Sequence, residues 1–391
     1  MPKQFRFQPI EPLVPERIRE ARLARGMTAI DLASCVGVTR QAISKYELGI
    51  AEPSSTVINE IAHSLNMPLS FFHKPLSAPE NQGTVFFRSL KTNAVRAKDI
   101  LSVKIQWAAQ LSKILAEEIL FPDADLPTLP EKFLQSVSYS YDDIEEITLF
   151  LRKHWKIGTA PISNMSRLLE SHGIVVASVK TGFSETDACS AVIGKRPFVF
   201  LDLQKECAVR TRFNMAHELG HLVLHQDISQ IELEDKNTLD RIEREANQFA
   251  SCFLLPRASF LLDIRSTSLM SFLPLKEKWK VSIQAMVYRC RELEVFSENQ
   301  MIYIQKQISA KRWRKNEPYD DIWSCENAVI LRTATQMLID RGDYTKEEFT
   351  SMFRLPAEDI EEICGLPSGY LSTGSQIKPI VINFNPDKGN K

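Results

Sequence analysis

The chain has 391 residues, with 48 Lys or Arg and 49 Asp or Glu. This length suits two or three domains, because a single domain usually holds roughly 100 to 200 residues. The near balance of charge argues against a chain that coats nucleic acid or carries an acidic tail, so any nucleic-acid surface must be local.

The cysteines and the N-terminus indicate the compartment. The seven cysteines are scattered and form no CxxC pair, which is typical of reduced thiols and not of a disulfide framework or a cysteine-ligated zinc. The first residues, MPKQFRFQPIEP, lack the apolar segment of a signal peptide, and no run of about 18 apolar residues occurs. We therefore expect a cytoplasmic protein with no membrane partner.

Residues 1–75 are expected to form an all-α DNA-binding domain. Their apolar residues recur at helical spacing in four short blocks separated by turn signals. Gly37 suits the left-handed end of the second block, and Thr39 is a natural N-cap for the third. This pair of blocks predicts a helix-turn-helix.

The segment GVTRQAISKYELGIAEPS resembles the Cro/C1-type (XRE) helix-turn-helix family. Four apolar residues at core spacing, which are Ala33, Val38, Ile43 and Leu48, leave a polar face on the third helix for the major groove. The predicted DNA-contacting residues are Thr39, Arg40, Gln41, Ser44 and Lys45. Arg40 and Gln41 are the first candidates for base contacts, because Arg pairs with guanine and Gln with adenine.

Phosphate contacts and dimerisation are further expectations for this domain. Thr39, Arg17, Arg19 and Arg22 are candidates for phosphate contact. Residues 1–75 hold nine Lys or Arg and seven Asp or Glu. This small positive charge would bind DNA weakly in a single copy, so two copies that bind together are expected. The expected partners are a double-stranded DNA operator and a second copy of the chain in a homodimer.

Residues 76–130 are expected to be a helical connector. A polar loop and the aromatic patch VFFRSL, predicted to dock one domain on another, precede a helix-compatible run from about Asn93 to Leu120. The proline-punctuated FPDADLPTLP then marks a boundary.

Residues 131–265 are expected to form an α+β domain. Two helices, DDIEEITLFLRKHW and SNMSRLLESHG, precede the strands GIVVASV and PFVFLDL. A helix with the segment AHELGHLVLH follows, and a further helix from Leu239 to Leu255 stops at Pro256.

The segment AHELGHLVLH contains the pattern His217-Glu218-x-x-His221. Both histidines lie on one helix face and can reach one cation, whereas Glu218 is placed as a general base. A match of five residues also arises by chance, but the helix is amphipathic, with its apolar residues on the opposite side. His225 lies eight residues from His217, about 12 Å along the axis, so we expect it at the helix end as a partner of the site and not as a ligand.

A catalytic zinc needs a third protein ligand, which the next helix can supply. In IEREANQFASCFLLP, Glu243 and Glu245 both flank an apolar stripe, and periodicity does not separate them. This segment and RTRFNMAHELGHLVLH resemble the ImmA/IrrE group of gluzincin-like metallopeptidases, over roughly residues 140–260. The resemblance implies that the third ligand is a glutamate directly before an alanine, which matches Glu245, and that Asn247 is a hydrogen-bond partner of a ligand. Asn214 stands where the family often has a small hydroxyl residue.

Residues 266–391 are the least informative part. KEKWKVSIQAMVYRCRELEVFSENQ predicts two helices around a V-S turn, and its basic residues are expected to pack against the peptidase domain more readily than to bind nucleic acid. The tail segment IKPIVINF predicts a last strand.

These segments predict an α+β multidomain fold. It comprises a Cro/C1-type helix-turn-helix domain (1–75), a connector (76–130), a gluzincin-like metallopeptidase domain (131–265) and a mostly helical C-terminal domain (266–391). The expected cofactor is Zn²⁺, and Glu218 would take a proton from the attacking water and pass it to the leaving amine.

The predicted function is transcription regulation by a DNA-bound zinc endopeptidase that cleaves a partner repressor, a partner toxin or its own chain. The resemblance to the family implies control of a stress response or a mobile element. The alternative is a non-proteolytic repressor or antitoxin whose peptidase-like domain senses a ligand or binds a partner protein.

Overall fold

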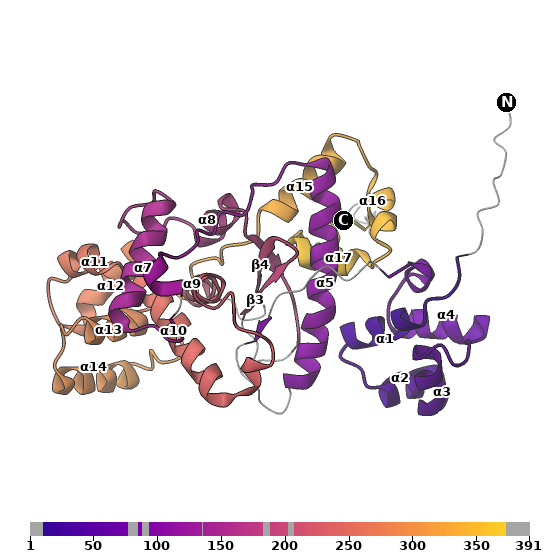
Figure 1. Ribbon diagram of the computed structural model, residues 1–391, viewed down its shortest axis with the longest axis horizontal. Coiled ribbons are helices and arrows are strands. Elements are labelled where there is room, and N and C mark those ends of the chain that lie inside the picture. The colour runs from indigo at the N-terminus through magenta and orange to yellow at the C-terminus, as the bar shows by residue number, and fades with distance from the viewer. Residues whose placement is uncertain are drawn as a thin grey trace, which may run out of the picture.

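The computed structural model describes residues 11–76, 85–87, 94–134, 136–182, 188–201 and 207–372. A sheet lies in the middle of this described part, with helices on both of its faces (Figure 1). The strands are β1 (Phe86–Phe87), β2 (Val175–Ser178), β3 (Ala188–Ile193) and β4 (Arg196–Leu201). Their order is β1-β3-β4-β2, with β2 parallel to β4 and the other neighbours antiparallel.

The strands β2 and β4 were predicted from the sequence, whereas β1 and β3 were not. β3 has the sequence ACSAVI, whose small residues carry little of the β-branched and aromatic character that marks a strand. β1 consists of the two phenylalanines of VFFRSL, and its backbone pairs with that of β3 at the sheet edge. Residues 88–90 of this patch lie outside the described residues.

Alternation along the strands sends side chains into two different cores. Val176 and Val199 face one core, and Val175 and Phe198 face the other. The sheet therefore separates the motif-bearing helices from the helix-turn-helix side of the molecule.

The first core is built from the helices that follow the connector. These are α6 (Glu131–Leu134), α7 (Tyr141–His154), α8 (Met165–Ser171), α9 (Ala208–Leu224), α10 (Lys236–Leu254), α11 (Arg257–Asp263), α12 (Phe272–Trp279), α13 (Ile283–Glu292) and α14 (Glu298–Ala310), with the 3-10 turn η3 (Leu269–Ser271). The 3-10 turn η2 (Glu232–Glu234) packs through Leu233 in a separate small cluster with Ile242. α12 and α13 are the two helices predicted around the V-S turn. Their basic residues Lys276 and Arg289 are buried in ion pairs, with Glu317 at 2.9 Å and with Glu145, so they hold the domain together and are not available to nucleic acid.

The second core joins the N-terminal domain to helices from two distant parts of the chain. It contains α1 (Pro15–Ala24), α2 (Ala29–Val36), α3 (Arg40–Glu47), α4 (Ser55–Ser64), η1 (Leu69–His73), α5 (Ala94–Glu118), α15 (Ile330–Asp340), α16 (Lys346–Phe353) and α17 (Ala357–Cys364). In Figure 1, α1 to α4 lie at one end of the molecule and α11 to α14 at the opposite end. The region predicted as one C-terminal domain is thus divided between two cores.

The four predicted N-terminal helices are present, each with a local reason to start or stop. Thr28 forms a capping box with Asp31 at the start of α2, and Gly37 ends that helix with φ +74°. Thr39 accepts a hydrogen bond from the backbone of Ala42, 3.1 Å away, and so caps α3. Leu48 was predicted in the core, but it is 71% exposed. It is the C-cap residue directly after α3.

The tail segment IKPIVINF, residues 377–384, lies outside the described residues. Among the described residues, no helix has both the length and the apolar character that a membrane crossing requires.

Candidate metal centre

The motif histidines lie together in the middle of α9. His217 and His221 are fully buried, and their Nε2 atoms are 3.1 Å apart. This is the placement expected for positions i and i+4 of one helix.

α10 brings Glu243, and not Glu245, to these two nitrogens. One carboxylate oxygen of Glu243 is 3.5 Å from Nε2 of His217, and the other is 3.4 Å from Nε2 of His221. The side chain of Glu245 points to a different part of the site, where it contacts His225 at 3.0 Å. The two glutamates are two residues apart, about 200° around the helix, so only one of them can face the histidines. The structure thus brings Glu243 to the two histidines and places Glu245, the ligand expected from the resemblance, beside His225.

The spacing of the three side chains fits a tetrahedral metal ion. Four ligands at about 2.0 to 2.1 Å from a central zinc lie about 3.3 Å from one another. The separations among His217, His221 and Glu243 are 3.1, 3.4 and 3.5 Å. They form the one group of described histidine, cysteine and acidic side chains with the spacing of a metal site.

Asn247 fixes the orientation of His217. Its Oδ1 is 3.1 Å from Nδ1 of His217, and its Nδ2 donates to the backbone oxygen of Glu243 at 2.8 Å. This second bond sets which end of the amide faces the imidazole, so His217 donates through Nδ1 and keeps the Nε2 lone pair for a cation.

His225 and Glu245 act on His221 in the same way. Nδ1 of His221 is 3.0 Å from Nδ1 of His225, whose Nε2 is 3.0 Å from a carboxylate oxygen of Glu245. Burial lowers the pKa of His225 to about 4, so its ring is neutral and carries one proton. With that proton donated to Glu245, His225 accepts from Nδ1 of His221, so Nε2 of His221 presents its lone pair toward His217 and Glu243.

Glu218 follows His217 on α9 and is linked to the sheet by a hydrogen bond. It is 1% exposed, and its carboxylate accepts a 2.6 Å hydrogen bond from the hydroxyl of Ser190 on β3. Ser190 was missed because β3 was missed, and a lone serine in ACSAVI gives no sequence signal of its own.

A glycine inside the motif permits the close approach of α9 and α10. A Cβ placed on Gly220 would lie 3.1 Å from Cβ of Phe249 and 3.2 Å from Cα of Ala246. Contacts this short are tighter than most, so a side chain here would require α10 to shift by a few tenths of an ångström. Gly220 thus contributes to the helix spacing from which Glu243 reaches the histidines.

A cavity of about 1110 Å³ opens beside this group of residues. Its walls come from the N-terminal half of α9, from α10 and α13, and from residues 313–320. Glu243 and Asn247 line it, together with the partly exposed rings of Phe213, Tyr288 and Trp313. The candidate centre therefore faces a space large enough for several residues of a peptide.

The DNA-facing residues predicted on α3 lie at the surface. Thr39, Arg40, Gln41 and Lys45 are exposed, and Ser44 is half-buried. Two of the arginines predicted to contact phosphate instead form hydrogen bonds or an ion pair within the domain. Arg17 is buried and donates to the backbone oxygens of residues 74 and 75, and Arg22 pairs with Glu47 at 2.6 Å.

Two family models match the chain. Residues 18–72 match the model described as Helix-turn-helix, and residues 169–291 match the M78 peptidase model described as IrrE N-terminal-like domain. The second range includes all of α9 and α10 and all but the last residue of α13. The chain therefore combines a helix-turn-helix DNA-binding domain with a domain of the M78 peptidase type.

Similar curated proteins are named as regulators. A Sinorhizobium medicae protein and a Rhizobium meliloti protein, both named uncharacterized HTH-type transcriptional regulators, are each 37% identical over 75 residues. The regulator YonR of Bacillus subtilis, named as derived from the SPbeta prophage, is 32% identical over 59 residues. These matches cover 15 to 19% of this chain and 52 to 55% of the relatives, so the chain spans about half the length of each relative.

Proposed function

We propose that this protein is a DNA-binding transcription regulator with a zinc-dependent endopeptidase domain that cleaves a partner repressor, a partner toxin or its own chain. The observation that carries the proposal is the convergence of His217, His221 and Glu243 beside a buried Glu218 and an open cavity. A purely structural zinc site uses four protein ligands, whereas three ligands next to a cavity are typical of a catalytic site.

The residues of the chain divide the work of peptide hydrolysis. His217, His221 and Glu243 would hold the zinc, which as a Lewis acid polarises a carbonyl and acidifies water. Glu218 is the general base that takes the proton of the attacking water and returns it to the leaving amine. Ser190 holds one oxygen of Glu218, so the other oxygen keeps a fixed direction.

The cavity walls position the substrate. The rings of Phe213, Tyr288 and Trp313 offer apolar contact to side chains of an extended peptide. Gln248, which also lines the cavity, has a buried Nε2 without a hydrogen-bond partner among the described atoms. A peptide carbonyl would satisfy this donor.

The proposal for the other domain is binding of an operator through α3. Arg40 and Gln41, exposed at the start of this helix, are the proposed base-contacting residues, and Thr39, Ser44 and Lys45 complete the contact face. A homodimer would place two such helices in successive major grooves and double a modest local charge.

The substitution Glu218→Gln tests the enzymatic part. The variant removes the base without removing a proposed zinc ligand, so we expect metal content and operator binding to persist and cleavage to fall by about a hundredfold or more. Comparing the new protein N-termini in cells that express wild-type or variant protein identifies the substrate directly. The exposed Glu277→Gln on α12 is the matched control and should behave as wild type.

Unchanged behaviour of the Glu218→Gln variant would contradict the peptidase proposal. If cells with Glu218→Gln show the same N-termini and the same derepression as cells with wild type, the chain does not act by proteolysis. The non-proteolytic repressor or antitoxin would then be the correct description.

A further inference from the structure

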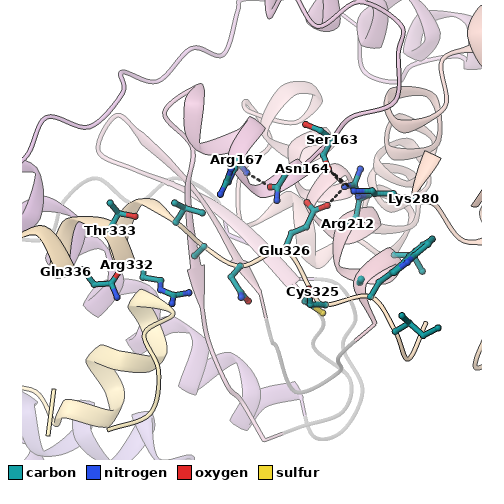
Figure 2. A pocket seen from close by; sticks show the side chains of 18 residues that line it. Ser163, Asn164, Arg167, Arg212, Lys280, Cys325, Glu326, Arg332, Thr333 and Gln336 are labelled. Atoms are coloured by element: carbon teal, nitrogen blue, oxygen red, sulfur yellow. Dashed lines mark hydrogen bonds and ion pairs between the residues drawn. The ribbon is translucent and has the colours of Figure 1, made fainter. Parts of the chain in front are cut away.

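A second cavity of about 700 Å³ is lined in part by the first turn of α9 (Figure 2). Its lining comes from α8, from the start of α9, from residues 322–329 and from the first two turns of α15. It lacks the proposed zinc ligands, so it is a different site from the substrate cavity.

The lining of this cavity is strongly cationic. Its charged residues are Arg167, Arg212, Lys280, Arg332 and Glu326. Four positive groups thus face one negative group, in a chain whose net charge is −1.

One of the four cations is already neutralised. Arg212 is buried, pairs with Glu326, and donates to the backbone oxygens of residues 162 and 163 at 2.6 and 3.0 Å. Within the described part of the chain, no carboxylate lies within ion-pair distance of Arg167, Lys280 or Arg332. Arg167 interacts electrostatically with Glu170, and Lys280 donates to the backbone oxygen of Ser163 at 3.3 Å. Arg332 is also half-buried, and an arginine taken partly out of water is stabilised by an anionic partner.

The three available cations come from three separate elements. Arg167 lies on α8, Lys280 ends α12, and Arg332 lies on α15, and Figure 2 shows them around the segment that carries Glu326. Thr333, next to Arg332, and Gln336, one turn further along α15, add neutral hydrogen-bonding groups to the same lining. The volume lies within the roughly 300 to 1000 Å³ range of small-molecule sites.

We propose that this cavity binds a small molecule that carries two or more phosphate groups. Such a ligand supplies the negative charge that the three cations lack, and guanidinium groups bind phosphate oxygens through paired hydrogen bonds. The shared chemistry is a diphosphate, which inorganic pyrophosphate and nucleoside triphosphates both contain.

This cavity and the substrate cavity are lined by neighbouring segments of the chain, so a ligand bound in one can affect the other. Residues 313–320 line the substrate cavity, and the residues directly after them, 322–329, line this one. Val209 on α9 lines both. A ligand bound to residues 322–329 would therefore also restrain a wall of the substrate cavity. This effect on cleavage rests on the proposed peptidase function, whereas the binding of the ligand does not.

Isothermal titration calorimetry of the full chain tests the binding, with inorganic pyrophosphate and ATP as separate probes. We expect saturable binding with one site per chain. Arg332→Gln and Arg167→Gln should each weaken it by about tenfold or more, because each removes a charge-assisted hydrogen bond. Arg167 is exposed, so its variant should fold normally even if Arg332→Gln does not.

The matched control is Arg291→Gln, an exposed arginine on α13 that lines neither cavity. Equal affinity for the two probes would support a site for the diphosphate alone, and tighter binding of ATP would support a nucleotide site. The proposal is overturned if neither probe binds with a dissociation constant below about 1 mM, or if Arg291→Gln weakens binding as much as Arg332→Gln does. Calorimetry detects binding whether or not the chain is a peptidase, so this result is independent of the Glu218→Gln experiment.

Discussion

At the centre of the site, each motif histidine has a fixed hydrogen-bond partner for the nitrogen that faces away from Glu243. Asn247 serves His217, and His225, supported by Glu245, serves His221. These partners select the tautomer in which the Nε2 atom of each ring carries the lone pair and the Nδ1 atom carries the proton. The two glutamates of α10 therefore have different roles, one facing the cation position and the other holding a histidine.

The different roles of the two glutamates predict different metal contents. Glu243→Gln should lose most bound zinc, because it removes the one charged ligand proposed for the ion. Glu245→Gln should retain zinc with an affinity lower by about 10- to 100-fold, the usual effect of losing a partner of a ligand histidine. Zinc per chain, measured by mass spectrometry after dialysis against a graded chelator, distinguishes them. The reverse order of affinities would restore Glu245 as the ligand.

At the scale of elements, α9 and α10 form the site by packing against each other at a glycine. Gly220→Ala places a methyl group about 3.1 Å from Phe249, so the helices must separate. We expect a loss of stability of roughly 1 to 3 kcal/mol, typical of overpacking, together with weaker zinc binding because Glu243 moves with α10. Thermal unfolding and zinc titration of the same variant check both effects. Unchanged zinc affinity would show that this helix spacing does not control the site.

A reciprocal pair of caps joins α8 to the segment before α15. Glu326 accepts from the backbone of Met165 and Ser166 at the start of α8, and Glu170 at its end accepts from the backbone of Val329 and Ile330 at 2.9 and 3.0 Å. Burial raises the pKa of Glu170 to about 7, although the two backbone donors act in the opposite direction.

The raised pKa of Glu170 predicts a specific pH dependence of stability. Between about pH 4.5 and 7 the folded state holds this proton more tightly than the unfolded state, so the free energy of unfolding falls as pH rises through this window. The loss is on the order of 3 kcal/mol. Glu170→Gln carries no titrating group, so the stability of wild type relative to this variant should decline from pH 4.5 to 8 in urea unfolding experiments. A constant difference would contradict the raised pKa.

At the scale of the whole molecule, the DNA-binding domain is packed against the rest of the described chain. Arg25, at the end of α1, forms two hydrogen bonds of 3.0 and 2.7 Å with Asp359 of α17. The ring of Phe71 lies edge-on to Trp107 of α5, with centroids 6.0 Å apart. One continuous apolar core thus runs from the helix-turn-helix to the far face of the sheet.

Asp359→Asn tests whether this ion pair couples the domains. Asp359 is 6% exposed, and losing its charge leaves Arg25 with neutral partners at the interface. We expect destabilisation of roughly 1 to 3 kcal/mol and a calorimetric transition that splits into two. Arg96→Gln is the control, because Arg96 and Asp31 are 3.8 Å apart and about half exposed, and such pairs contribute little. A single transition at the wild-type temperature would show that apolar packing alone couples the domains.

Local patterns in the sequence determined the helices and the chemistry of the motif. Capping residues, glycines and 3.6-residue periodicity placed α1 to α4, and the spacing of His217 and His221 placed both rings on one helix face, because these features depend on neighbours within a few residues. The tertiary structure decided everything that needed two distant segments side by side. The approach of α9 and α10 at Gly220 brought Glu243 to the histidines, the pairing of β3 with β4 brought Ser190 to Glu218, and the sheet divided residues 266–372 between two cores. Periodicity describes one helix at a time, so it could offer both Glu243 and Glu245 but could not choose between them.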